Sequence, residues 1–128
     1  MERVFFLHTK KKRILIMDIL SIKNVKESAK IVNECEEMIS HLPMKSVLLL
    51  TDATDSSCDL MRIDSLKSFS KRISPFILAS SVVGAKYEKK LVIKILEQIS
   101  ERKIKIFLSI QETIVTFFHS NFLIAFFL

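Results

Sequence analysis

The sequence predicts a single α/β domain in which helices cover a mixed β-sheet. Short apolar segments alternate with longer segments whose apolar residues recur every three or four positions, as in strands that alternate with amphipathic helices. The first two apolar segments are separated by only a few polar residues, which favours a hairpin. The 128 residues include one glycine and two prolines, too few for an all-β domain with many tight turns.

The antiparallel hairpin is expected at the beginning of the chain. Val4–His8 is predicted to form its first strand, and residues 13–20 are predicted to form a second, more buried strand. The polar residues between them are expected to form the turn. Asn24, which follows a short connection, is a candidate N-cap for the first helix.

Three parallel strand–helix units are expected to follow the hairpin. The first helix is predicted over residues 25–41 and ends before Pro43. The apolar face of this helix is predicted to consist of Val25, Ala29, Val32, Cys35, Ile39 and Leu42. The continuous apolar run at residues 46–51 is typical of a strand that is covered on both faces.

The second half of the chain is expected to complete the sheet. A second helix is predicted between residues 60 and 73, a strand over residues 76–83, and a third helix over residues 86–100. A last strand at residues 103–108 and a short helix at 111–118 are expected to follow. Repeated strand–helix–strand units predict parallel pairing with right-handed crossovers, and thus one domain over residues 1–128, with residues 120–128 as an apolar C-terminal extension.

Composition limits the classes of function. Hydrophobic residues make up 49% of the chain and charged residues 27%, a balance that argues against disorder. Cys35 and Cys58 have no spacing typical of a metal site, and they predict reduced thiols, with Cys35 as a small core residue. The sequence shows neither a signal peptide nor the roughly 20 apolar residues of a membrane-spanning helix, so we expect a cytoplasmic location.

The sequence does not predict an enzyme, a metal site or a cofactor, because its three histidines are isolated from other ligands or bases. Asp18 and Asp52 are both expected at the carboxyl ends of parallel strands, the edge at which open α/β sheets bind ligands. These carboxylates could hold a polar ligand there, although such aspartates more often cap helices or accept hydrogen bonds from loop amides. Gly84 could place helix amides near an anion, and the commoner reason for such a glycine is a tight turn with positive φ.

Three segments together resemble one family. They are residues 14–18 (ILIMD), residues 46–52 (SVLLLTD) and residues 79–84 (ASSVVG), the last of which leads to Lys89 and Lys90. This arrangement resembles the STAS-like proteins, which include the anti-sigma factor antagonists, and is most similar to small stand-alone bacterial members. The resemblance covers residues 12–118. It implies a non-catalytic protein-interaction or regulatory module, whereas the distant relation of this family to CRAL-TRIO lipid-transfer domains implies a carrier that binds an apolar or lipid-like ligand between sheet and helices.

The resemblance also implies a functional loop after the third strand. In the antagonists, the phosphorylated residue lies in an Asp-Ser-Ser-Gly-type motif between a strand and the next helix. Residues 55–58 of this chain read Asp-Ser-Ser-Cys, so a cysteine replaces the first glycine of the motif. The candidate residues for phosphorylation or interaction are Asp52, Thr54, Asp55, Ser56 and Ser57. Because the glycines are missing, helix capping is favoured over a phosphorylation switch at Ser56 or Ser57.

Charge and the end of the sequence indicate the possible partners. The net charge of +6 permits contact with nucleic acid or anionic lipid, but few exposed aromatic residues are expected beside the basic segments. We therefore expect no specific nucleic-acid partner, and membrane contact only without a spanning helix. Residues 122–128 (FLIAFFL) carry no charge and must be covered by their own domain, by a second subunit or by lipid. A homodimer through this apolar segment is the leading expectation, together with an unidentified protein partner.

Overall fold

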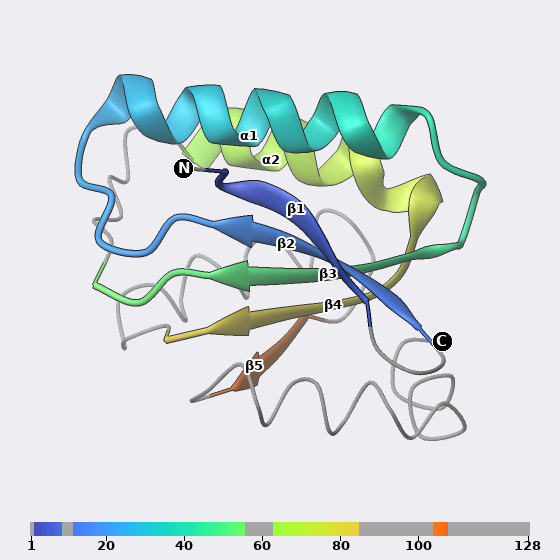
Figure 1. Cartoon of the computed structure of the whole chain (residues 1–128). Helices are drawn as coiled ribbons and strands as arrows, with labels where there is room; N and C mark the ends of the chain where they lie inside the picture. The colour runs from blue at the N-terminus through green and yellow to red at the C-terminus, as the bar shows by residue number, and fades with distance from the viewer. Residues whose placement is uncertain (1, 9–11, 56–62, 85–103, 108–128) are drawn as a thin grey trace.

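The described residues of this computed structural model are 2–8, 12–55, 63–84 and 104–107. They form one sheet in which the five strands lie in the order β1-β2-β3-β4-β5 (Figure 1). The strands are β1 (Val4–His8), β2 (Arg13–Asp18), β3 (Val47–Asp52), β4 (Ile77–Val83) and β5 (Ile104–Phe107). The helices are α1 (Val25–Ser40), α2 (Ile63–Ile73) and the short 3-10 helix η2 (Ser74–Phe76).

The strand directions confirm the predicted mixed sheet. β1 and β2 pair antiparallel, with Phe6 opposite Leu15, and this pair is the expected hairpin. β2, β3, β4 and β5 pair in parallel, each with the next strand along the chain. The helices predicted at residues 86–100 and 111–118, and the apolar extension at residues 120–128, lie outside the described residues.

Helix α1 begins where the sequence predicts. The side-chain Oδ1 of Asn24 accepts hydrogen bonds from the amides of Lys26, at 2.8 Å, and Glu27, at 3.3 Å. Asn24 thus satisfies two of the amide groups that the first turn of a helix leaves without a partner. The helix continues to Ser40, three residues before Pro43.

The predicted buried face of α1 is wrong at its first turns. Cys35 and Ile39 are fully buried, as expected, but Val25 is 49% exposed and Ala29 is also exposed. The buried stripe instead runs through Ile31, and three residues before it lies the half-buried Ser28. Three- and four-residue spacings describe two neighbouring stripes on a helix, and the sheet contacts the one that contains Ile31.

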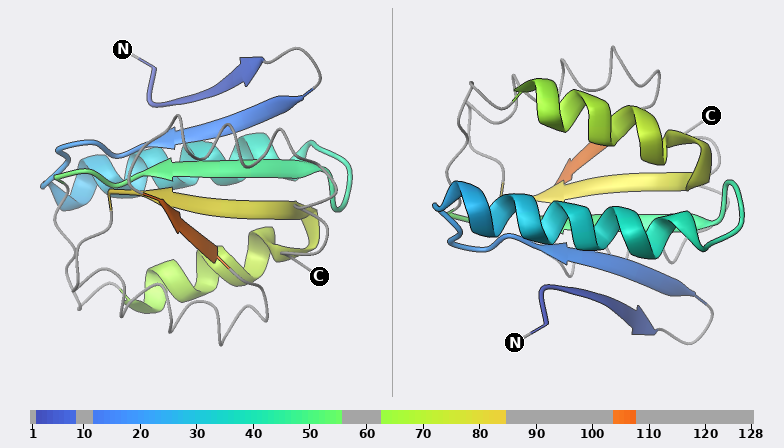
Figure 2. Two further views of the ribbon diagram at one scale, coloured as in Figure 1. Left: turned by 90° about the horizontal axis from the view of Figure 1, so that it is seen from below. Right: turned by 90° about the horizontal axis from the view of Figure 1, so that it is seen from above.

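Helices α1 and α2 pack side by side on the same face of the sheet, which we call the first face (Figures 1 and 2). Arg72 of α2 and Glu36 of α1 join them by a bidentate ion pair: Arg72 Nε donates to both carboxylate oxygens, at 3.0 and 2.9 Å, and Nη2 donates to Oε1 at 2.8 Å. Beneath the helices lies a core that includes Leu15, Leu49 and Ile73. The predicted core position of Cys35 is confirmed, and burial, with Glu34 and Glu36 adding to it, raises the pKa of its thiol to about 12.

The opposite side of the sheet, which we call the second face, is apolar as well. Its buried residues are Ile14, Ile16, Leu48, Leu50, Ala79 and Val83, and Phe5 and Leu7 of β1 pack against them. A bulge in β4 sets which residues point to this face, because Val47 pairs with Ile77 whereas Leu48 pairs with Ala79. Buried apolar side chains on both faces confirm the prediction that β3 is covered on both sides.

Candidate functional site

The structure brings Asp18, Asp52 and Gly84 to one edge of the sheet. Asp18 and Asp52 end β2 and β3 and are direct register partners, so their side chains project from the same face of the sheet. Asp52 also pairs with Val83, the residue before Gly84. This edge, at the carboxyl ends of three parallel strands, is where open α/β sheets bind ligands.

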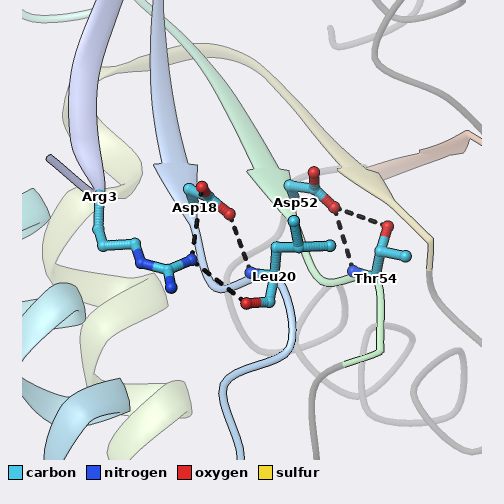
Figure 3. A network of polar contacts seen from close by, with 5 residues as sticks. All are labelled: Arg3, Asp18, Leu20, Asp52 and Thr54. Atoms are coloured by element: carbon cyan, nitrogen blue, oxygen red, sulfur yellow. Dashed lines mark hydrogen bonds and ion pairs between the residues drawn. The ribbon is translucent and has the colours of Figure 1, made fainter. Parts of the chain in front are cut away.

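The carboxylate of Asp18 is held by groups of its own chain (Figure 3). Its Oδ1 accepts a hydrogen bond from the amide of Leu20 at 2.9 Å, and its Oδ2 lies 3.5 Å from Nη1 of Arg3. The same Arg3 nitrogen donates to the carbonyl oxygen of Leu20 at 3.2 Å. Asp18 therefore fixes the turn that follows β2 and attaches the residue before β1 to it.

One oxygen of the Asp52 carboxylate is occupied as well. Its Oδ1 accepts one hydrogen bond from the amide of Thr54, at 3.1 Å, and a second from the Thr54 hydroxyl, at 2.7 Å (Figure 3). Asp52 is only 8% exposed. A side-chain oxygen that binds the amide two residues later is a common way to form a turn, so the contacts of Asp52 are those of a loop-forming residue.

Backbone hydrogen bonds continue past the strand ends and join the loops to one another. The amide of Ile19 donates to the carbonyl oxygen of Asp52 at 2.9 Å, and that of Ser21 donates to the carbonyl oxygen of Thr54 at 2.8 Å. The amide of Ala53 donates to the carbonyl oxygen of Val83 at 2.9 Å. The loops after β2 and β3 and the end of β4 thus form one hydrogen-bonded layer.

Three residues of this layer have left-handed backbone conformations. They are Ser21, with φ of 58°, Asp55, with φ of 53°, and Gly84, with φ of 75°. Ser21 and Asp55 stabilise each other, because the Ser21 hydroxyl donates to Oδ2 of Asp55 at 3.1 Å. Nζ of Lys23 lies 3.5 Å from the other oxygen of Asp55. The loops after β2 and β3 are therefore also joined through side chains.

Gly84 allows the loop after β3 to approach closely. A Cβ atom at this position would overlap with Oγ1 of Thr54 and would lie 2.7 Å from its Cα. The positive φ was one of the two sequence-based interpretations of Gly84, whereas the contact with Thr54 has no signal in the sequence. The described contacts of Gly84 are those of a tight turn packed against a neighbouring loop.

The sequence did not predict that two apolar side chains at this edge are exposed. Leu20 is 39% exposed and Val25 is 49% exposed, and both lie in or next to the connection from β2 to α1. The feature of the sequence that could have indicated this exposure is the position of Leu20, which lies between a predicted strand and the predicted helix cap at Asn24. Together with the exposed Lys23 and Asp55, these side chains give the edge apolar and charged groups side by side.

Of the predicted loop residues, Thr54 and Asp55 are both exposed, and Ser56 and Ser57 lie outside the described residues.

Elsewhere, His41 caps the end of α1 and is exposed, with Nε2 3.1 Å from Oε1 of Glu37. Within the described ranges, no group of three or more His, Cys, Asp or Glu residues could hold a metal ion. In that same part of the chain, no helix is long and apolar enough to cross a membrane.

Two further features bear on ligand binding. A hollow of about 150 Å³, open to solvent, lies near the amino end of β3 and the carboxyl end of α1, where Arg13 stacks over the ring of Phe6 at 4.1 Å. It is smaller than the roughly 300–1,000 Å³ of typical small-molecule sites. Ser81 of β4 alternates with Ala79 and Val83 on the second face, and its buried hydroxyl oxygen has no hydrogen-bond partner.

Comparisons with known proteins support the fold. No protein-family model matches the sequence, and no curated protein matches it. The structure is similar to the crystal structure of an uncharacterized protein of the DUF3478 family from Shewanella loihica PV-4, which has a SpoIIAA-like fold. The TM-score is 0.69 at 8% sequence identity, and the similarity covers 88% of this chain and 90% of that chain. The chain therefore has a SpoIIAA-like fold, which is the STAS-like fold that the sequence resemblance implies.

Proposed function

We propose that this chain is a non-catalytic protein-interaction module whose partner docks at the carboxyl edge of the sheet. The interaction edge, as we define it, consists of Leu20, Ser21, Lys23, Val25, Thr54 and Asp55. The observation that carries the proposal is a division of roles at this edge. The inner carboxylates are bound by the chain's own amides, whereas the outer side chains are exposed.

The occupied carboxylates favour interaction over catalysis. A general acid or base must reach the proton that it transfers, within hydrogen-bond distance or through one water. Asp52 uses the same oxygen for the amide and the hydroxyl of Thr54, and Asp18 uses its two oxygens for an amide and a guanidinium. Both side chains thus act as supports for loops, which is the role that a docking surface requires of them.

The outer side chains have the composition of a small interface. Protein interfaces combine an apolar centre with a polar, solvent-accessible rim. At this edge, Leu20 and Val25 supply exposed apolar area, and Lys23 and Asp55 supply paired charges. The hydrogen bonds between the loops hold the surface in one conformation, which reduces the entropy lost when a partner binds.

Site-specific photo-crosslinking in cells of the source organism tests this proposal. A photo-reactive amino acid replaces Leu20 at the interaction edge or, as a control, Met44. Met44 is 70% exposed and lies between α1 and β3, at the other end of the sheet. We expect a discrete crosslinked product from position 20 that is absent from position 44 and is lost when Asp55→Arg is added. The same product from both positions, or from position 44 alone, would refute the proposed surface.

A carrier of an apolar ligand is a second candidate, and Ser81 is the observation that favours it. A buried hydroxyl without a hydrogen bond costs roughly 1–3 kcal/mol, and a ligand acceptor on the second face would remove that cost. Native mass spectrometry of the purified full chain distinguishes the two candidates. A carrier predicts a stoichiometric apolar adduct that is weakened by Ser81→Val, and an adduct-free chain contradicts the carrier.

A further inference from the structure

The two faces of the sheet differ in the described elements that cover them. On the first face, α1 and α2 contribute Ile31, Ile39 and Ile73 to the core. On the second face, Leu50 is fully buried and Ile14 is 1% exposed, yet none of the described helices lies on this side (Figures 1 and 2). A surface that is both apolar and buried requires a cover, and the chain topology limits which segment can supply it.

The connection from β4 to β5 is expected on the first face. The parallel strands β2, β3, β4 and β5 follow one another in a single direction across the sheet. The two described crossovers, through α1 and α2, both run over the first face. Crossovers between parallel strands share one hand, and the strand order does not reverse, so this rule predicts that the connection from β4 to β5 runs over the same face.

The charge patterns of the two remaining long segments agree with this assignment. Residues 85–103 carry many charged side chains, as a helix with one face in water requires. Residues 108–128, which follow β5, are different, because Glu112 is their one charged residue and residues 122–128 are all apolar. Such a segment is stable in water only when most of its surface is covered.

We propose that residues 108–128 dock on the second face of the sheet of their own chain. The face and the end of the segment are complementary in chemistry, since residues 122–128 are all apolar and the second face presents a cluster of buried apolar side chains. The contact lies on a different surface from the interaction edge and does not depend on the proposed function. It is an alternative to the homodimer predicted from the sequence, because a segment that covers its own sheet is not available to a second subunit.

Photo-crosslinking within the full-length chain tests this proposal. Phe5 and Phe6 are neighbours on β1, both half-buried, and they pack on the second and the first face respectively. p-Benzoylphenylalanine replaces each phenylalanine in turn, which keeps an aromatic ring at the position. Irradiation of a mixture of ¹⁵N-labelled and unlabelled chains, followed by peptide mass spectrometry, separates crosslinks within one chain from crosslinks between two chains.

From position 5 we expect crosslinks within one chain to peptides of residues 108–128. From position 6 we expect crosslinks to the peptide around Leu42 and Val47, which line the same hollow as Phe6. Crosslinks from position 5 to residues 85–103, crosslinks between labelled and unlabelled chains, or no product with residues 108–128 would each overturn the proposal. Position 7, whose Leu7 side chain also packs on the second face, gives the same test if the variant at position 5 does not fold by circular dichroism.

Discussion

The substitution Gly84→Ala tests whether the loops of the carboxyl edge are built as one rigid layer. Alanine at φ of 75° has to adopt a left-handed conformation, which costs roughly 1–2 kcal/mol. Its Cβ would lie 2.7 Å from Cα of Thr54, a backbone atom that can move only with its loop. Crowding of this kind costs roughly 1–3 kcal/mol. We therefore expect the free energy of unfolding to fall by about 3 kcal/mol, the sum of these terms.

Urea denaturation followed by circular dichroism measures this loss, and Gly84→Asn is the matched control. Asparagine tolerates a left-handed backbone better than alanine does, so it recovers the conformational part of the loss but not the contact part. We expect the asparagine variant to remain clearly less stable than the native chain, because its Cβ meets the same Thr54 atoms. If Gly84→Ala is as stable as the native chain, or if Gly84→Asn has full native stability, the inferred close contact between Gly84 and the Thr54 loop is refuted.

Three further predictions concern the frame that holds the edge. Asn24→Ala removes the cap of α1 and should lower the free energy of unfolding by about 1 kcal/mol, measured by urea denaturation. On the second face, Leu50→Ala should cost roughly 2–5 kcal/mol, whereas Ser81→Ala should leave the ligand-free chain as stable or more stable, and a large loss for Ser81→Ala would show that its hydroxyl has a partner. The third prediction concerns the thiol of Cys35, whose pKa is about 12 in the folded chain and near 9.0 when unfolded. Because the unfolded chain loses this proton first, stability should fall as the pH rises from about 9 to 12, with a slope of up to roughly 1.4 kcal/mol per pH unit that Cys35→Ala lacks.

Much of the fold is contained in local sequence patterns. Strand β1 matches its predicted bounds, and β2, β3 and β4 differ from theirs by one or two residues at the ends. The cap at Asn24 could be predicted because the contacts of a cap span only a few residues. The failure at Val25 and Ala29 shows the limit of periodicity, which finds an apolar stripe on a helix but does not determine which side of that stripe faces the sheet.

The candidate site is predictable in position but not in detail. That Asp18 and Asp52 would meet at one edge followed from the order of strands and helices, since parallel strands end on the same side. The contact of Thr54 with Gly84 depends on the registers of β3 and β4, which include a bulge that no local pattern signals. The burial of two adjacent serines in β4, Ser80 and Ser81, also has no signal in the sequence. Successive side chains of a strand point to opposite faces of the sheet, so two neighbours are both buried only when both faces are covered.

The most direct test of the proposed interaction edge is the dissociation constant of the crosslinked partner, measured by isothermal titration calorimetry with purified full-length chains. Leu20→Asp changes an apolar side chain of the edge, and Met44→Asp changes an even more exposed apolar side chain away from it. We predict that Leu20→Asp weakens binding at least tenfold, about 1.4 kcal/mol, whereas Met44→Asp leaves the dissociation constant unchanged. Unchanged binding by Leu20→Asp, or weakened binding by Met44→Asp alone, would contradict the proposal that the partner docks at the carboxyl edge.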